Sequence, residues 1–463
     1  MSWSSRGSRI STEPASTRPF RRSFTAVVVV LALLCGGFAV LGYVQGPKLS
    51  SAQVDTDQVT TRSGQQLRMF ANQPLAAVKP ADVTVTPAAD FSVTTSGAVV
   101  AVEFEQPLHY DAHYVVEVDG VTSRFDDQAS TLSYDFTTGS PPLYYLDRGD
   151  TTDEIVRTAV KGTERTVVYS APRIQEFALL GTTAAVSADA GDGTSTLSLV
   201  SFDDGGVEPI NLPAPGRIEN LHSADDGVTI GFAFSTADGA YDDTLMTLDF
   251  EAGRDIVPVK ALDGTPLAVT NWFFIPGGVT LAAQNRADES VLLVDTSTGA
   301  VTPLGIFTSL ESLSTDATRL GVTNPFGPVA LSIADLADTE FAPSPIDGVT
   351  PFAGEFQLMR GTALVQHVVL VDYSSSAFEN LLVADDGTTS RQIFRTKDDA
   401  GSIGDFSVSP NDQYVAVEVV PNVATSVSDG YPVNDRSTSV TTIVIDIATG
   451  AQVKSVAGLA LQW

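Results

Sequence analysis

The segment LLVDTSTGAVTPL, residues 292–304, decides the fold of this chain. Its apolar start reads as a strand ending at Asp295, Gly299 marks a tight turn, and a second strand follows. The same pattern occurs six more times, with turns marked at Gly162, Gly205, Gly253, Asp338, Gly387 and Gly450. Neighbouring markers lie 39–49 residues apart, except the last two, which are 63 apart. Because a period of roughly 40–50 residues is typical of four-stranded propeller blades, the sequence predicts an all-β fold with a seven-bladed β-propeller over residues 141–463.

A second repeated element lies upstream of these turns. Its clearest copy is SVSPNDQYVAVEV, residues 407–419, and residues 222–234 and 314–324 are weaker copies. The element resembles the inner hairpin of TolB-like and other WD40-like propellers. Asn411-Asp412 stands where those families prefer Asp-Gly, so the resemblance is to the class of propellers and not to one family.

The end of the chain predicts how the ring closes. The first repeat, from about Leu143, is one strand short, and residues 457–463, AGLALQW, read as an opening strand with nothing after it. An open ring would leave two unpaired sheet edges. We therefore expect the C-terminal residues to complete the first blade.

Residues 46–139 alternate apolar and polar side chains with the period of two that strands require. Val100, Val102 and Phe104 share one face of a predicted strand, and Leu132 and Phe136 share one face of another. Several such short strands within about 90 residues predict a β-sandwich.

The same region resembles the bacterial Ig-like domains of the SbsA type. The resemblance covers residues 67–88, 99–118 and 132–139; it includes Leu108 six residues before Tyr114 and the terminal Phe136-Thr-Thr-Gly139. Asn72-Gln73-Pro74 departs from the family, where an acidic residue is commoner. The resemblance implies a spacer or adhesive module on a bacterial surface protein, and it brings no catalytic residues.

An apolar stretch over residues 24–44 follows a basic tail over residues 1–23 that contains five arginines. About 21 helical residues suffice to cross a bilayer, and basic flanks remain in the cytoplasm. The sequence thus predicts a single-pass membrane protein with a cytoplasmic N-terminus and an extracytoplasmic bulk. A signal peptide cleaved near Ser50-Ser51-Ala52 and a lipid anchor at Cys35 are the alternatives, and both also imply export.

The composition limits the partners. The chain has 56 acidic residues against 26 lysines and arginines, for a net charge of −30. So acidic a protein repels nucleic acid, which is excluded as a partner. The single cysteine, Cys35, lies within the apolar stretch, so the extracytoplasmic part has no disulfide and no thiolate chemistry.

The sequence contains no recognisable motif of a common active site. Among four histidines, His109 and His113 have the spacing of helical metal ligands, but they flank a predicted turn and are expected at the surface. His367 lies in an apolar run and is expected to be buried and hydrogen-bonded. Acidic turns such as Asp203-Asp204 lack the spacing of a calcium loop. We expect no catalytic residue, no metal site and no cofactor.

The best candidate for binding is a polar insertion over residues 420–440, which is long for a loop within a blade. Long loops on a rigid scaffold often bind ligands. The predicted binding residues are Asp429, Tyr431, Asp435 and Arg436. The alternative interpretation is a tolerated insertion without function.

These observations predict a non-enzymatic, membrane-anchored extracytoplasmic binding or scaffold protein. Its propeller would be an interaction platform for a protein, a peptide or a cell-wall glycan, carried on an Ig-like stalk. Two alternatives are a glycan-acting hydrolase or lyase that uses acidic residues in the propeller funnel, and the ectodomain of an envelope sensor.

Overall fold

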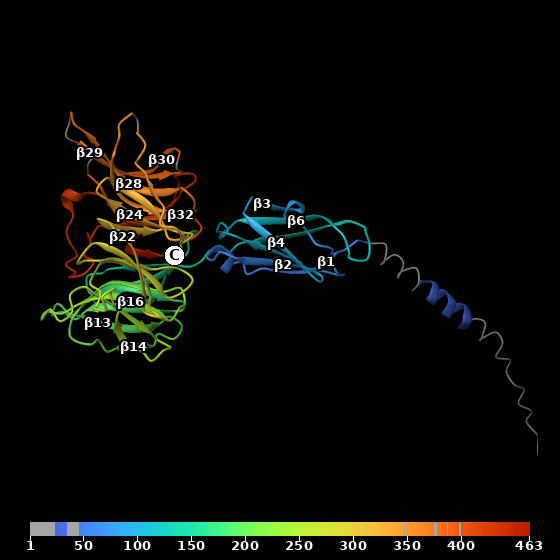
Figure 1. Ribbon diagram of the computed structural model, residues 1–463, viewed down its shortest axis with the longest axis horizontal. Helices are drawn as coiled ribbons and strands as arrows, with labels where there is room; N and C mark the ends of the chain where they lie inside the picture. Colours follow the sequence, from blue (N-terminus) through green and yellow to red (C-terminus); the bar gives the residue numbers. More distant parts are fainter. Residues whose placement is uncertain (1–23, 35–45, 347, 375–376, 387, 398–399) are drawn as a thin grey trace, which may run out of the picture. The chain divides into compact units, whose positions relative to one another are not determined.

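The computed structural model describes residues 24–34, 46–346, 348–374, 377–386, 388–397 and 400–463 (Figure 1). Residues 24–34 are helical. Among the described residues, no helix has both the length and the apolar character needed to cross a bilayer. Residues 1–23 and 35–45 lie outside the described part, so the basic tail and the membrane helix over residues 24–44 stay predictions.

The rest of the chain forms two compact units. The first comprises the described residues up to Asp55 together with Gln66–Glu105 and His113–Phe136. One of its sheets has the order β1-β2-β5-β4 and the other the order β3-β6-β7. The strands are β1 Leu49–Gln53, β2 Gln65–Ala71, β3 Val83–Thr86, β4 Phe91–Ser96, β5 Val99–Phe104, β6 His113–Val121 and β7 Ser130–Thr137, with a short 3-10 helix, η2, at Pro80–Asp82.

The two sheets of this unit pack face to face. The rings of Phe104 on β5 and Phe136 on β7 lie 6.3 Å apart between centroids, and Tyr114 on β6 stacks on Phe136 at 5.8 Å. Val100, Val102 and Phe104 are fully buried, as their alternation predicts. The unit is therefore a β-sandwich, while its resemblance to the SbsA type stays a prediction.

The second unit comprises Thr56–Gln65, Gln106–Ala112 and Thr137–Trp463 and contains seven four-stranded antiparallel sheets, which we number as blades 1 to 7. Blade 1 contains β8 Leu143–Asp147, β9 Asp153–Thr158, β10 Thr166–Ala171 and β35 Leu459–Gln462; blade 2 contains β11 Ile174–Leu180, β12 Thr183–Asp189, β13 Ser195–Ser201 and β14 Val207–Ile210. Blade 3 contains β15 Arg217–Ser223, β16 Thr229–Ser235, β17 Thr244–Asp249 and β18 Ile256–Pro258; blade 4 contains β19 Val269–Phe274, β20 Thr280–Asn285, β21 Ser290–Asp295 and β22 Ala300–Ile306. Blade 5 contains β23 Ser309–Leu313, β24 Arg319–Asn324, β25 Gly327–Ser332 and β26 Asp338–Glu340; blade 6 contains β27 Phe352–Leu358, β28 Leu364–Asp372, β29 Ala377–Asp385 and β30 Ser390–Arg395. Blade 7 contains β31 Ser402–Val408, β32 Tyr414–Val420, β33 Thr441–Asp446 and β34 Gln452–Ala457, and the unit also has the 3-10 helices η1 Gln58–Thr60 and η3 Val423–Thr425.

These sheets have the arrangement of a seven-bladed propeller. The first strands β11, β15, β19, β23 and β27 contact one another in succession, so the first strands of blades 2 to 6 face the centre of the ring. The predicted turns at Gly162, Gly205, Gly253, Gly299 and Gly450 lie between the two outer strands of their blades; Gly299, for example, joins β21 to β22 with a φ of +72°, which favours glycine. The marker Asp338 is instead the first residue of β26, so the turn of blade 5 comes just before it. The predicted turn at Gly387 lies outside the described residues.

The C-terminal strand closes the ring, as the sequence predicts. β35 pairs antiparallel with β8, with Leu459 opposite Leu146 and Gln462 opposite Tyr144. Blade 1 thereby has the strand order β10-β9-β8-β35, in which the last strand of the chain supplies the inner strand (Figure 1). We call β35 the closing strand.

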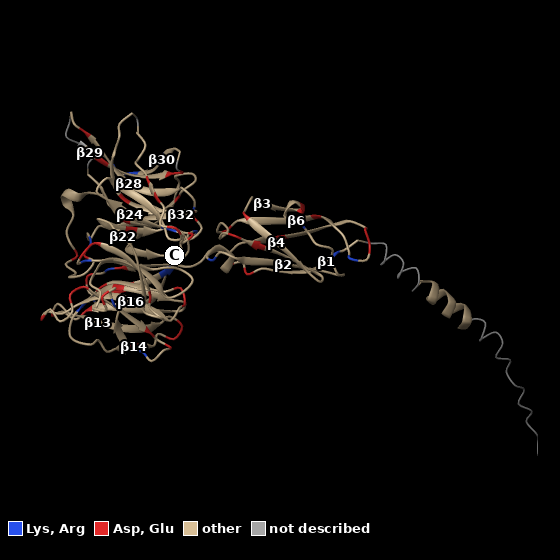
Figure 2. Cartoon of the chain, viewed as in Figure 1, with Lys and Arg blue, Asp and Glu red and all other residues tan. Residues whose placement is uncertain are grey.

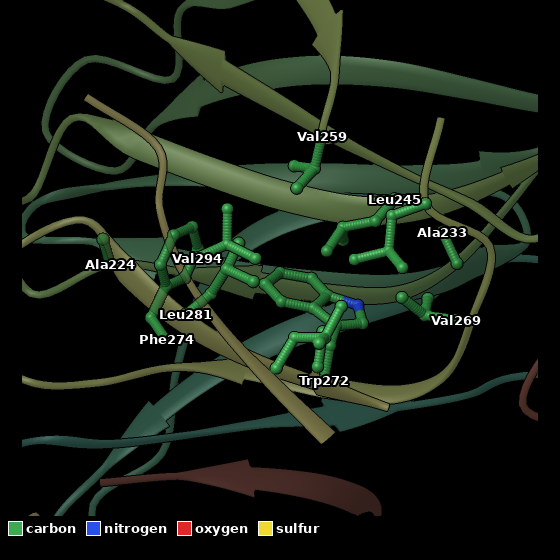
Figure 3. Close-up of a cluster of buried hydrophobic side chains, with 12 residues drawn as sticks. Ala224, Ala233, Leu245, Val259, Val269, Trp272, Phe274, Leu281 and Val294 are labelled. Carbon is green, nitrogen blue, oxygen red and sulfur yellow. The ribbon is translucent and has the colours of Figure 1, made fainter. Parts of the chain in front are cut away.

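The core of the propeller consists of apolar clusters between blades. In one of them, Trp272 of β19 is fully buried among aliphatic side chains of blades 3 and 4 (Figure 3). A Cβ atom on Gly231 of β16 would lie 2.4 Å from the indole ring, so only glycine leaves room there. Phe274 of the same strand is also buried in this cluster.

The unusual Asn411-Asp412 turn of blade 7 has a structural reason. The Asn411 side-chain amide donates to the carbonyl of Leu108 at 3.0 Å, and so holds the segment Gln106–Ala112. Asp412 has a φ of +59° and accepts a hydrogen bond from Arg360 Nε of blade 6 at 2.7 Å. An Asp-Gly turn would lack both contacts.

Deletion of residues 457–463 is expected to destabilise the propeller strongly. It removes the closing strand, including the buried Leu459 and Leu461, and it exposes an edge of β8. Two buried leucines alone account for about 3 kcal/mol or more. Urea unfolding should show a lower midpoint for the truncated chain, and an unchanged midpoint would contradict closure by this strand.

Candidate functional site

The centre of the propeller is hollow. One cavity of about 680 Å³ is lined by the first strands of blades 3 to 7, and a second of about 520 Å³ is lined by those of blades 1, 2, 3 and 7. His222, Asp405 and Ser407 line both cavities, so the two adjoin. We call them together the channel; all seven inner strands contribute to its wall.

Four blades place a carboxylate on the channel wall. These residues are Glu176 on β11, Glu311 on β23, Glu355 on β27 and Asp405 on β31. In each of these strands the pairing with the next strand shifts register at or beside the acidic residue. A β-bulge of this kind turns a side chain out of the regular alternation. Among the described residues that line the two cavities, none is a lysine or arginine.

The carboxylates of blades 5, 6 and 7 influence one another. Enclosure in the channel raises the pKa of Glu355, and the nearby Asp405 and Glu311 raise it further, while Arg436 opposes the shift. Glu311 accepts hydrogen bonds from the hydroxyls of Ser309 and Thr323. Because like charges disfavour ionisation of their neighbours, a cation placed among these groups would be stabilised.

The opposite wall has two further titratable groups. Desolvation raises the pKa of Glu176 to about 7, although the backbone N–H groups of Leu221 and Asn220 donate to its carboxylate at 3.1 and 3.3 Å. The His222 ring, reached by solvent through the channel, lies edge-on to Trp272 at 5.0 Å. Desolvation by the surrounding protein lowers the pKa of His222 to about 4, so this histidine is neutral at pH 7. It therefore adds no positive charge to offset the carboxylates of the wall.

The predicted binding loop, residues 420–440, joins β32 to β33 of blade 7 and packs against blade 1. We call it the docking loop. Arg148, which follows β8, forms an ion pair with Asp429 at 2.6 Å, and the two side chains are only 5% and 9% exposed. The Arg148 guanidinium also lies 3.9 Å above the Tyr431 ring, whose hydroxyl donates to Asp153 of β9 at 2.6 Å.

A second arginine, Arg173, holds the loop from the start of blade 2. Its guanidinium lies 4.4 Å from the centre of the Tyr431 ring and donates to the carbonyl of Gly430 at 3.0 Å. Its Nε pairs with Asp189 of β12 at 2.6 Å. Tyr431 is thus held between two arginines, and the docking loop joins the last blade to the first two.

The other two predicted binding residues lie at the channel side of the loop. Arg436 donates through Nε to Glu418 of β32 at 2.9 Å, and its Nη2 pairs with the channel carboxylate Asp405. Asp435 is exposed and accepts a hydrogen bond from the Ser428 hydroxyl at 3.3 Å. Two of the four predicted residues, Asp429 and Tyr431, therefore contact another blade, while Arg436 contacts blade 7 itself. The role of all four in ligand binding stays a prediction.

Sequence reasoning missed the channel acids, although a signal was present. Three inner strands carry an acid directly before a phenylalanine, at Glu176-Phe177, Glu355-Phe356 and Asp405-Phe406. Because this pair recurs at equivalent positions of three blades, it predicts that the three acids face the centre of the propeller.

The histidines behave differently from one another. His367 Nε2 lies 2.9 Å from the Asn380 side-chain oxygen, which confirms the predicted hydrogen bond, while the residue is half-buried and not fully buried as expected. His113 is 3.9 Å from Asp135 on the sandwich surface. Within the described ranges, no group of three or more histidine, cysteine or acidic side chains is placed to hold a metal ion.

Known proteins provide limited comparison. No protein-family model and no curated protein sequence matches the chain. Among solved structures it is similar to a putative 6-phosphogluconolactonase from Bacteroides fragilis, with 14% identity over 70% of this chain and 97% of that one and a TM-score of 0.42. It is also similar to the β-propeller domain of the trilobed protease from Pyrococcus furiosus, with 11% identity over 76% and 96% of the two chains and a TM-score of 0.41.

A third similar structure is the dihydro-heme d1 dehydrogenase NirN, with 13% identity over 69% of this chain and 74% of that one and a TM-score of 0.41. The three proteins differ in the activities that their names state. Likenesses of this degree say nothing of the activity of this chain.

Replacing Glu176 by glutamine is expected to stabilise the propeller at pH 8. Because the folded-state pKa is raised from 4.5 to about 7, ionisation of Glu176 opposes folding, and stability from this group is lost as pH rises from about 4.5 to 7. The free energy of unfolding of the variant should exceed that of the unmodified protein by about 3 kcal/mol above pH 7, and the two should be equal near pH 4. Thermal unfolding of both proteins at pH 4 and pH 8 measures it; equal unfolding temperatures at pH 8 would show that Glu176 is not desolvated.

Proposed function

We propose that this chain is a membrane-anchored extracytoplasmic binding protein whose propeller takes a cationic ligand at the channel. The helix predicted over residues 24–44 is the anchor, and the β-sandwich, of the SbsA Ig-like type, is the stalk. The observation that carries the proposal is the set of four channel carboxylates, together with the absence of lysine and arginine from the described lining residues.

Charge supports a basic ligand. A concave site with aromatic side chains and a few convergent polar groups is the usual form of a ligand site, and the channel has the half-buried rings of Phe273 and Phe406 beside its acids. Along the rest of the propeller, positions of acidic residues are also more frequent than those of basic residues (Figure 2). A low-dielectric cleft lined by one sign of charge concentrates the opposite sign. Of the ligands considered, a protein or peptide segment with basic side chains fits this field better than a neutral glycan.

One observation favours a second function. A glycan-acting hydrolase needs a carboxyl group that stays protonated near neutral pH beside a second, ionised carboxylate. The pKa of Glu355 is raised by burial and by the neighbouring Asp405 and Glu311, which is the direction that a general acid requires. Release of reducing ends from cell-wall glycans, lost in Glu355→Gln, would establish this function in place of simple binding.

Neutralising the channel is expected to weaken binding of a basic peptide. The triple variant Glu311→Gln, Glu355→Gln, Asp405→Asn should bind Ac-Gly-Arg-Gly-Arg-Gly-amide about tenfold or more weakly than the unmodified protein, a loss of ~1.4 kcal/mol or more. Isothermal titration calorimetry at low salt measures this, with Ac-Gly-Glu-Gly-Glu-Gly-amide as the negative ligand.

The matched control removes the same number of charges from the outer turns of blades 2 and 3, as Asp203→Asn, Glu251→Gln, Asp255→Asn. These three side chains are exposed and line neither channel cavity. Equal weakening by both triple variants would mean that net charge, and not the channel, attracts the peptide.

The proposed topology has its own test. Proteinase K added to intact cells should digest the propeller, because the basic tail holds the N-terminus in the cytoplasm. An antibody against the propeller should detect the protein in untreated cells and should no longer detect it in cells treated with the protease. A propeller that resists digestion until the cells are permeabilised would overturn the extracytoplasmic assignment.

A further inference from the structure

We propose that Arg436, which lines neither cavity but pairs from the docking loop with the channel acid Asp405, is a built-in competitor of the ligand, and that the ligand presents an arginine side chain. This inference rests on the proposed function. The channel acids already bind one guanidinium, which belongs to the chain itself: Arg436 pairs with Asp405 and with Glu418. The site thus shows directly which chemical group it accommodates.

The two partners of Arg436 differ in burial. Glu418 is only 7% exposed and also accepts a hydrogen bond from the backbone N–H of Ala460 in the closing strand at 2.7 Å. Asp405 is 66% exposed and lines both channel cavities. Glu418 therefore fixes Arg436 at the wall, while Asp405 remains open to a second cation from the channel.

The charges around Arg436 are unbalanced. In the part of the chain that the structure describes, no lysine or arginine forms an ion pair with Glu311 or Glu355, and Arg436 serves Asp405 and Glu418 at once. One cation therefore faces four carboxylates of blades 5 to 7. A second guanidinium entering the channel can pair with Asp405 and relieve its repulsion with Glu355, at the cost of the Arg436 contact.

Geometry favours arginine over lysine as the ligand group. A guanidinium presents several N–H donors in one plane and can bridge two carboxylates, as Arg436 does, whereas an ammonium acts as a point charge. The carboxylates of Asp405, Glu311 and Glu355 come from neighbouring blades and face one cavity. A planar donor that bridges them matches this arrangement.

The docking loop fixes the position of the competitor. The backbone N–H of Arg436 donates to Asp429 Oδ1 at 3.2 Å, and the N–H of Asp429 donates to the carbonyl of Arg436 at 2.8 Å. Asp429 is also the partner of Arg148. The contact with blade 1 therefore sets where the Arg436 guanidinium lies, which gives the loop a part in ligand affinity without contact between Asp429 and the ligand.

The test measures affinity for Ac-Gly-Arg-Gly-Arg-Gly-amide and for the same peptide with citrulline, a neutral isostere, in place of arginine. Arg436→Gln should bind the arginine peptide about tenfold more tightly than the unmodified protein, since the competitor is gone. Arg436→Lys keeps the charge but cannot bridge Asp405 and Glu418, so its affinity should lie between those of the unmodified protein and Arg436→Gln. The citrulline peptide should bind none of them measurably.

The matched control is Arg254→Gln, which removes an arginine paired with Glu208 at the outer strands of blades 2 and 3 and should leave affinity unchanged. If Arg436→Gln fails to fold because Glu418 loses its partner, the double variant Arg436→Gln, Glu418→Gln replaces it. Equal or weaker binding by the Arg436 variant overturns the competitor while the proposed function stands. Absence of binding in every protein overturns the proposed function itself.

Discussion

The structure depends on one pairing, that of the closing strand β35 with β8. This pairing makes a ring out of a linear series of hairpins, because it joins the last residues of the chain to its first blade. The same strand forms part of the channel wall: Ala460, Leu461, Gln462 and Trp463 line one cavity. Trp463 further stacks on Tyr414 of blade 7, and its indole N–H donates to the Ser407 hydroxyl at 3.1 Å. The strand that closes the ring therefore also shapes the channel.

A ring of strands brings equivalent positions of different blades together, and this chain uses such a position for acids. Mutual repulsion and burial make the arrangement costly, as the raised pKa values of Glu176 and Glu355 indicate. Hydrogen bonds from backbone N–H groups and hydroxyls, and the single Arg436, offset part of this cost. Unfavourable charge that a fold maintains at a concave site is characteristic of binding or catalysis.

The sequence predicted those parts of the fold that local patterns encode. Gly299 and its counterparts marked the turns because a tight hairpin requires a residue that tolerates positive φ. The C-terminal strand was predictable because an open ring leaves unpaired edges. The sandwich followed from alternation such as that of Val100, Val102 and Phe104. Each of these inferences needs only neighbouring residues and one general rule of sheet construction.

The site was harder to predict because its residues meet only in three dimensions. Arg148 and Asp429 are 281 positions apart, and no sequence pattern around either residue predicts their contact. The sequence shows that the docking loop is long for a loop within a blade, but it could not show that Asp429 and Tyr431 would contact blade 1. The convergence of Glu311, Glu355 and Asp405 likewise depends on bulges and on ring geometry.

The most direct measurement is a crystal structure of the propeller with saturating Ac-Gly-Arg-Gly-Arg-Gly-amide. The account predicts an arginine side chain of the peptide in the channel, with its guanidinium within hydrogen-bonding distance of Asp405 and of Glu311 or Glu355. A peptide bound to an outer strand or turn, with the channel acids free of it, would contradict the account.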